Sequence, residues 1–182
     1  MTKKRTAHTA QGTALGAATV ASGLVAGVWY AFACGVMPAL ARTEDRVYVE
    51  VMQQINVVIE NPVFFAGFFG ALILIAVCAW QQRGKPAGRW VLAALVLYVL
   101  VVGVTSGANV PLNNELAAAG APAGIADPGA VRERFEDPWV LWNIVRGVLG
   151  TAAVYCLWHA TTRLRAARPD SAALPHARTT RI

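Results

Sequence analysis

Four long apolar runs, separated by polar segments, dominate the chain. They cover residues 14–36, 63–80, 90–108 and 140–158. A helix needs about 20 apolar residues to cross the hydrocarbon core of a bilayer, so each run is long enough to span it. The pattern predicts an all-α fold, an integral membrane four-helix bundle, formed by residues 13–162.

Prolines mark the expected ends of these helices. Pro38 follows the first run, and Pro111 follows the third within the segment Asn109-Val-Pro-Leu-Asn113. Proline lacks a backbone N–H and disfavours helix at the preceding residue. We therefore expect the first helix to end near Pro38 and the third near Asn109. Asp137-Pro138 has the residue types of an N-cap and first helical position, so we expect the fourth helix to begin there.

The segment 43–61 is expected to be more than a linker. Its apolar side chains recur at helical spacing: Val47, Val51, Ile55 and Val58. This spacing predicts an extra amphipathic helix on the outer membrane surface, between helices 1 and 2. Asn61-Pro62 indicates a bend before the next membrane helix. The longest connection, residues 115–137, is expected to be irregular apart from a short helix at 131–135.

Composition and charge agree with a membrane protein. Of 182 residues, 56% are hydrophobic and 14% charged, whereas soluble domains carry about 25% charged residues. Basic residues gather at the two ends and between the second and third runs, while the other two connections hold most of the acidic residues. The positive-inside rule then predicts a multi-pass plasma-membrane protein with both termini cytoplasmic, a basic tail at 1–12 and a disordered tail at 163–182.

The same distribution decides which partners we expect. The basic residues alternate with acidic segments along the chain, so the net charge of +6 does not indicate a nucleic-acid partner. The expected partners are the lipid bilayer and a hydrophobic aromatic small molecule, and homo-oligomerisation stays open.

Glycines four apart predict close approach of helix backbones: Gly23 with Gly27, and Gly103 with Gly107. The phenylalanines at 64–69 are interpreted as helix packing, and the cysteines as buried thiols.

A polar constellation interrupts the fourth run. Its members are spaced i, i+3, i+4 and i+7, on one helical face: Trp139, Trp142, Asn143 and Arg146. A cation at the bilayer centre costs about 2.5–3.5 kcal/mol, so we expect Arg146 to face the bundle interior and to have a partner. The candidate partners are Glu60, Glu115, Asn56, Asn109 and Asn113. Two interpretations remain: a structural staple between helices, or an anchor for an oxyanion or carbonyl in a pocket that opens outward.

Metal catalysis has little support in the sequence. His8 and His176 lie in the tails, and His159 lies at the inner end of the fourth helix. No metal-ligand spacing, catalytic triad or phosphate loop is evident. No cofactor is identified, and the pattern favours metal-free chemistry.

Four motifs spread over the chain carry a family resemblance. They are Met37-Pro38-Ala39-Leu40, Met52-Gln53-Gln54-Ile55-Asn56 with Asn61-Pro62, Asn109-Val-Pro-Leu-Asn113, and Trp139 through Trp142-Asn143-x2-Arg146. Together they resemble the anthrone oxygenase-like (DUF1772) membrane proteins. The resemblance implies a small four-helix membrane protein. Some members are similar to enzymes that oxidise an anthrone to an anthraquinone with O2 in polyketide pathways.

The resemblance implies an oxidoreductase of secondary metabolism, a monooxygenase or oxidase for an anthrone-like or other phenolic polyketide-type substrate. O2 would be the co-substrate, since an anthrone-type enolate can pass an electron to O2 without a metal. We expect catalytic roles for Arg146, Asn109, Asn113, Asn143 and Glu60, with Glu115 an alternative to Glu60 as base. We expect substrate contacts from Asn56, Gln53, Trp139, Trp142, Trp29 and Met37.

Two alternatives stay open. The same scaffold can serve a cyclase or isomerase that uses no O2. The chain can also be a non-catalytic membrane binding or transport protein in which the polar cluster joins helices. Fold alone does not decide among them.

Overall fold

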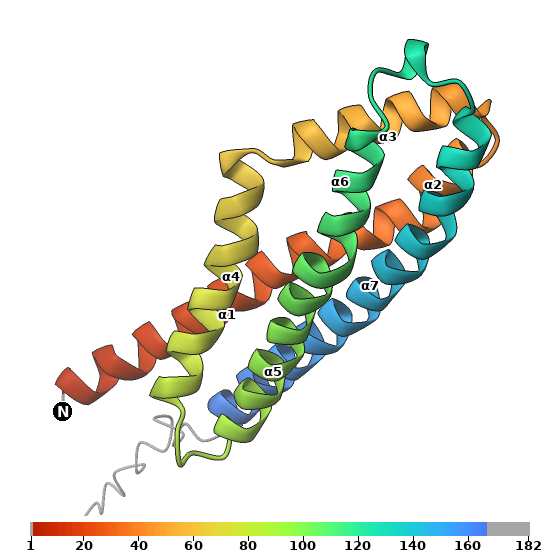
Figure 1. Cartoon of the computed structure of the whole chain (residues 1–182). Helices are drawn as coiled ribbons and strands as arrows, with labels where there is room; N and C mark the ends of the chain where they lie inside the picture. Colours follow the sequence, from red (N-terminus) through yellow and green to blue (C-terminus); the bar gives the residue numbers. More distant parts are fainter. Residues whose placement is uncertain (1, 167–182) are drawn as a thin grey trace, which may run out of the picture.

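The computed structural model describes residues 2–166, and the side chains of residues 10–164. This part of the chain is all-α (Figure 1). Its elements are α1 (Thr2–Ala31), η1 (Phe32–Val36), α2 (Met37–Leu40), α3 (Asp45–Ile59), α4 (Pro62–Gln81), α5 (Gly88–Val104), η2 (Thr105–Asn109), α6 (Val110–Ala118), η3 (Pro122–Gly124) and α7 (Pro128–Ala166). Here η1 and η2 are π-helical turns and η3 is a 3₁₀ turn.

Four helical stretches are long and apolar enough to cross a bilayer: Ala10–Leu40, Pro62–Gln81, Gly88–Ala118 and Pro128–Leu164. They confirm the predicted four-helix membrane bundle and imply contact with lipid. They also suggest a multi-pass membrane protein. The expected N-terminal tail at 1–12 is helical from Thr2 onward. Of the expected C-terminal tail at 163–182, α7 covers the start, and residues 167–182 lie outside the described part.

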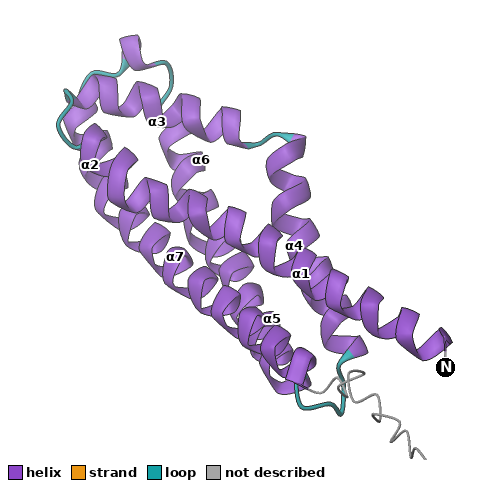
Figure 2. Cartoon of the chain, turned by 180° about the vertical axis from the view of Figure 1, so that it is seen from behind, coloured by secondary structure: helices purple, strands orange, loops and turns teal. Residues whose placement is uncertain are grey.

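The four long helices form a ring. α1 packs against α4 and α7, and α5 packs against α7 and α4, the α4–α5 contact being the least extensive. α3 crosses one end of the bundle, where it packs against α6 and α7, and the α4–α5 loop lies at the opposite end (Figure 1). Seen from behind, α4 and α6 diverge toward α3 (Figure 2).

The amphipathic helix between the first two spans is confirmed as α3. The expected bend after it is also present. The Asn61 side-chain oxygen accepts hydrogen bonds from the backbone N–H groups of Val63 and Phe64, each at 3.0 Å, and so caps α4. Its amide nitrogen donates to the Val58 carbonyl at 2.9 Å. One side chain therefore fixes the corner between α3 and α4.

The predicted helix ends at Pro38 and Asn109 are wrong. The first span runs through η1 into α2, and the third runs through η2 into α6. In both places a π turn ends just before the proline: Met37 N–H bonds to the Phe32 carbonyl, and Val110 N–H bonds to the Thr105 carbonyl. The wider turn shifts the hydrogen-bond ladder by one residue, so the helix continues past a residue that cannot donate.

The predicted start of the fourth helix is also wrong. α7 begins at Pro128, and the Asp127 carboxylate accepts a hydrogen bond from the Ala130 N–H at 3.0 Å. Asp127-Pro128 therefore provides the N-terminal signal expected at Asp137-Pro138, and Pro138 lies inside the helix. The short helix expected at 131–135 forms the first turns of α7.

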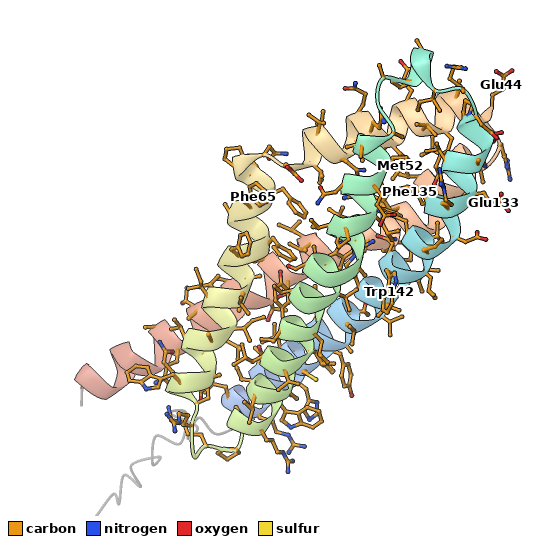
Figure 3. All side chains as sticks on the ribbon, in the orientation of Figure 1. Glu44, Met52, Phe65, Glu133, Phe135 and Trp142 are labelled. Atoms are coloured by element: carbon orange, nitrogen blue, oxygen red, sulfur yellow. The ribbon has the colours of Figure 1, made fainter. Side chains whose placement is uncertain are left out.

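Three apolar clusters fill the bundle, and their positions leave a polar layer near α3. The largest lies toward the α4–α5 loop and includes Leu15, Ile75, Val91, Tyr98 and Leu157. A middle cluster joins Trp29, Phe68 and Val101. The third lies beneath α3, where Met52 and Phe135 meet (Figure 3). Cys78 and Cys156 are buried as expected, whereas Cys34 is exposed.

Candidate active site

A cavity of about 180 Å³ lies between the middle cluster and α3. Every span and α3 contribute to its wall. The polar and aromatic lining residues are Trp29, Phe32, Asn56, Glu60, Phe64, Phe65, Phe68, Phe69, Thr105, Ser106, Asn109, Asn113, Trp139, Asn143 and Arg146. The wall combines aromatic rings, carboxamides, one guanidinium and one carboxylate.

Arg146 gives the cavity its charge. The residue is 7% exposed, and its guanidinium carbon lies 5.5 Å from the ring centroid of Trp29 and 5.7 Å from that of Trp139. One terminal nitrogen donates to Asn143 at 3.2 Å, and Nε has no hydrogen-bond partner. Among the described side chains, no Asp or Glu oxygen lies within 4.0 Å of it. The two rings and one amide therefore leave the cation without an anionic partner.

Asn143 orients the guanidinium. Its amide nitrogen donates to the Trp29 carbonyl at 3.0 Å, so its oxygen faces Arg146. The residue is completely buried. Because both hydrogen-bonding atoms of the amide are engaged, Asn143 links α1 to α7 and holds the cation at the cavity floor.

The π turn η2 brings two more amides to the cavity. Asn109 is 1% exposed; its nitrogen donates to the Trp139 carbonyl at 3.5 Å, and its oxygen has no partner. Asn113, one turn further on, accepts a hydrogen bond from the Trp139 indole nitrogen at 2.8 Å. From α3, the Asn56 side-chain nitrogen is also buried without a partner. Unsatisfied buried amides beside an unpaired cation are suited to a ligand with oxygen atoms.

The structure brings together eight of the residues expected at the site. They are Trp29, Asn56, Glu60, Asn109, Asn113, Trp139, Asn143 and Arg146. Their contact with the cavity is observed, whereas their catalytic and binding roles stay predictions.

Three residues expected at the site lie elsewhere. The Gln53 side chain donates to the carbonyls of Leu116 and Gly120 at 2.8 and 3.1 Å, and so satisfies the end of α6. Met37 is buried in the apolar cluster beneath α3. Trp142 is 37% exposed on the outside of α7 (Figure 3). Glu115, the other candidate base, lines a separate cavity between α6 and α7.

The sequence interpretation missed most of the aromatic wall. The sequence predicts helix packing for four phenylalanines that line the cavity as well as contacting one another: Phe64, Phe65, Phe68 and Phe69. Thr105 and Ser106 also line the cavity, and the sequence pattern predicts no role for them. Two hydroxyl residues in an apolar run, six and five positions before a proline, are the signal that would have pointed to η2.

Gly150 determines where the Trp29 ring lies. A Cβ atom at this position would lie 2.9 Å from the ring carbon Cζ3 of Trp29, whereas one at Gly147 would lie 3.8 Å from the Trp29 Cβ. We expect Gly150→Ala to lower the unfolding free energy by about 1–3 kcal/mol, because a buried ring must shift. Thermal unfolding in detergent measures this, with Gly147→Ala as the matched control. Equal melting temperatures for the two variants would contradict the assignment.

The described residues contain no group of three His, Cys, Asp or Glu side chains that could hold a metal ion. His159 lies away from the cavity, with its ring centroid 4.2 Å from that of Trp90.

Fold and site together define a membrane-embedded helical bundle with an arginine–amide cavity. The chain belongs to the anthrone oxygenase family, whose sequence model matches residues 61–156, more than half of the 182 residues. The matched region includes Asn109, Asn143 and Arg146. Family membership suggests an oxygenase, and hence oxidoreductase activity. Comparison with curated proteins and with solved structures gives no match.

Proposed function

We propose that this protein is a membrane-embedded oxygenase that oxidises an anthrone-like or other phenolic polyketide-type substrate with O2, as part of secondary metabolism. The observation that carries the proposal is the buried Arg146 cation, which faces an aromatic- and amide-lined cavity without an anionic partner. Family membership supports the reaction class.

The unpaired cation favours a substrate that becomes an anion. Desolvating a charge costs several kcal/mol when no opposite charge compensates it. A substrate enolate or phenolate oxygen within reach of Arg146 would supply that compensation. Donors fixed in place before the reaction stabilise developing charge strongly when water is excluded. The free Asn56 amide nitrogen would donate to a further ketone or phenol oxygen, and the free Asn109 oxygen would accept from a phenol O–H. The Trp29, Trp139 and Phe68 rings would contact the flat substrate.

The chemistry balances with O2 as the oxidant. Removal of a proton from the CH2 carbon opposite the ketone gives an enolate beside Arg146. The enolate passes one electron to O2, and the resulting carbon radical and superoxide combine to form a C–O bond. The peroxide takes up a proton, and loss of the remaining carbon-bound hydrogen with cleavage of the O–O bond releases water. The net change is CH2 + O2 → C=O + H2O, and in this proposal the substrate carbanion itself reduces O2.

Glu60 is the carboxylate that we assign as the base, because it is the acidic residue in the cavity wall. Glu115 is set aside because it lines a different cavity. We expect Glu60→Gln to lower kcat by about 10²–10⁴-fold, the usual contribution of a general base. The matched control is Glu50→Gln in α3, outside this cavity, which is expected to retain activity. Equal oxidation rates for Glu60→Gln and wild type would remove Glu60 from this role.

Oxygen uptake by the purified protein in lipid nanodiscs tests the proposal. We expect one O2 consumed per anthrone converted to anthraquinone. Conversion of the substrate without O2 uptake would instead indicate a cyclase or isomerase. Absence of any turnover, with Arg146 and Asn109 variants losing thermal stability, would indicate a non-catalytic binding or transport protein.

We also propose an orientation. Arg83, Lys85 and Arg89 lie in or beside the α4–α5 connection, at the end of the bundle opposite α3. By the positive-inside rule this end faces the cytoplasm, with both termini, and the cavity lies in the outer half of the plasma membrane.

A further inference from the structure

We infer that the substrate enters the cavity sideways from the lipid, through an opening between α4 and α6 bordered by Phe65, Phe69 and Val110. The identity of the ligand, a flat aromatic ketone, rests on the proposed function. The position of the opening rests on the surface of the bundle alone.

The three bordering residues line the cavity and also lie on the outer surface of the bundle. Phe65 is 41% exposed, Phe69 is 46% exposed, and Val110 is 39% exposed. All three lie inside stretches that are apolar and long enough to cross a bilayer. Their exposed faces therefore contact acyl chains, and the cavity wall at this point is also the lipid-facing surface.

The helix arrangement produces this opening. α4 follows α1 along the bundle, whereas α6 continues from α5 toward α7. As a result α4 and α6 diverge in both views (Figures 1 and 2), and Phe65 lies on the upper part of α4 (Figure 3). The side chains of Phe65 and Phe69 border the cavity on the α4 side, and Val110 borders it on the α6 side.

Packed side chains close the cavity in three other directions. The cluster of Met52, Leu116 and Phe135 separates the cavity from the far end of α3. The largest core cluster closes the end toward the α4–α5 loop. On the side of α1 and α7, the buried Trp29 separates the cavity from an apolar groove on the outer surface. Glu60 lines the cavity and is exposed at the corner of α3 and α4, so its carboxylate gives protons a path to water.

An apolar opening that leads to the buried Arg146 cation selects ligands by their charge state. A neutral aromatic ketone dissolved in acyl chains can pass between phenyl rings at little electrostatic cost, whereas an ion cannot. Inside, the Arg146 cation favours the deprotonated form. The structure therefore fits a substrate that enters neutral and is ionised at the floor.

Stopped-flow kinetics with anthraquinone as the probe test the opening. The protein is reconstituted in phosphatidylcholine nanodiscs, and binding is followed by quenching of its tryptophan fluorescence. Phe69→Trp narrows the opening, so we expect association and dissociation rates to fall together by about tenfold, with little change in Kd, as for a gate. Ile73→Trp, four residues further along α4, is the matched control, because Ile73 is exposed and lies outside the cavity wall. Phe69→Ala widens the opening and is expected to raise both rates.

Two outcomes would contradict the proposed opening. In the first, Phe69→Trp and Ile73→Trp bind and release anthraquinone at equal rates, and Phe69→Ala does so at the wild-type rates. In the second, the folded protein does not bind anthraquinone. Oxygen uptake separates these results from the proposed function. If the protein consumes O2 with anthrone but Phe69→Trp and Ile73→Trp bind anthraquinone at equal rates, the oxygenase proposal stands and the lateral opening is wrong. If Phe69→Trp slows anthraquinone binding but the protein consumes no O2, the lateral opening stands and the oxygenase proposal is wrong.

Discussion

Replacing Arg146 by methionine is expected to reduce the oxidation rate sharply while leaving the bundle as stable as before or more so. Removal of one donor to a developing oxyanion lowers kcat by about 10²–10³-fold. The unchanged or increased stability follows because the guanidinium is buried without an anionic partner, and a straight apolar side chain carries no such desolvation cost. Oxygen uptake and thermal unfolding of the same nanodisc preparation measure both quantities.

The matched control is Arg134→Met, on the first turns of α7, where the exposed guanidinium donates to the Ala130 carbonyl. We expect this variant to keep its oxidation rate. A structural staple would behave differently, since Arg146→Met would then lower the melting temperature. A stable Arg146→Met variant with unchanged turnover would also contradict the account.

Replacing Asn143 by aspartate is expected to have the second largest effect. The side chain keeps its shape but places a carboxylate 3.2 Å from the guanidinium, at the position of the present amide oxygen. This carboxylate would pair with Arg146 and neutralise the charge intended for the substrate. It would also lose the hydrogen bond that the amide now donates to the Trp29 carbonyl. We expect anionic ligands to bind about 100-fold more weakly, and oxidation to fall in proportion.

Titration with a hydroxyanthraquinone measures the affinity of the Asn143→Asp variant. Asn114→Asp on α6 is the control, because Asn114 is exposed and lies outside the cavity. If Asn143→Asp binds the ligand as tightly as wild type does, Arg146 does not supply the attraction.

Much of the site could be predicted from helical spacing, but the edges of a helical face could not. Relative to Trp139, Asn143 and Arg146 point within about 40° of the same direction at 3.6 residues per turn, whereas Trp142 points about 60° away. That difference places Trp142 on the outer surface. Spacing alone treats all four residues as one face. The neighbouring helices determine how wide the buried part of that face is.

The π turns could not be predicted from single-residue rules. Proline was expected to end the helix, since it cannot donate a hydrogen bond. In the structure the preceding turn widens instead, and the helix continues with Asn109 and Asn113 on the cavity side. The sequence predicts the polar segment itself, but not that it continues as α6, which packs against α3 and α7.

Glycine spacing also did not predict where the helices pack closely. The spacing of Gly23, Gly27, Gly103 and Gly107 predicted close helix approach, yet a Cβ atom at any of these positions would meet nothing within 4 Å. The tight position is Gly150, where the Trp29 ring packs against the backbone of α7. A glycine is required where a large side chain from another helix arrives, and sequence spacing within one helix does not reveal that side chain.

The most direct test of the central claim is the ionisation state of a bound ligand. Hydroxyanthraquinones change colour when the phenol ionises, so their absorbance reports charge inside the cavity. With wild-type protein we predict the phenolate spectrum at a pH at which the free ligand is neutral, because Arg146 lowers the pKa of the bound phenol. A bound ligand that stays neutral, or that ionises equally in Arg146→Met, would contradict the proposal that this cation stabilises the substrate anion.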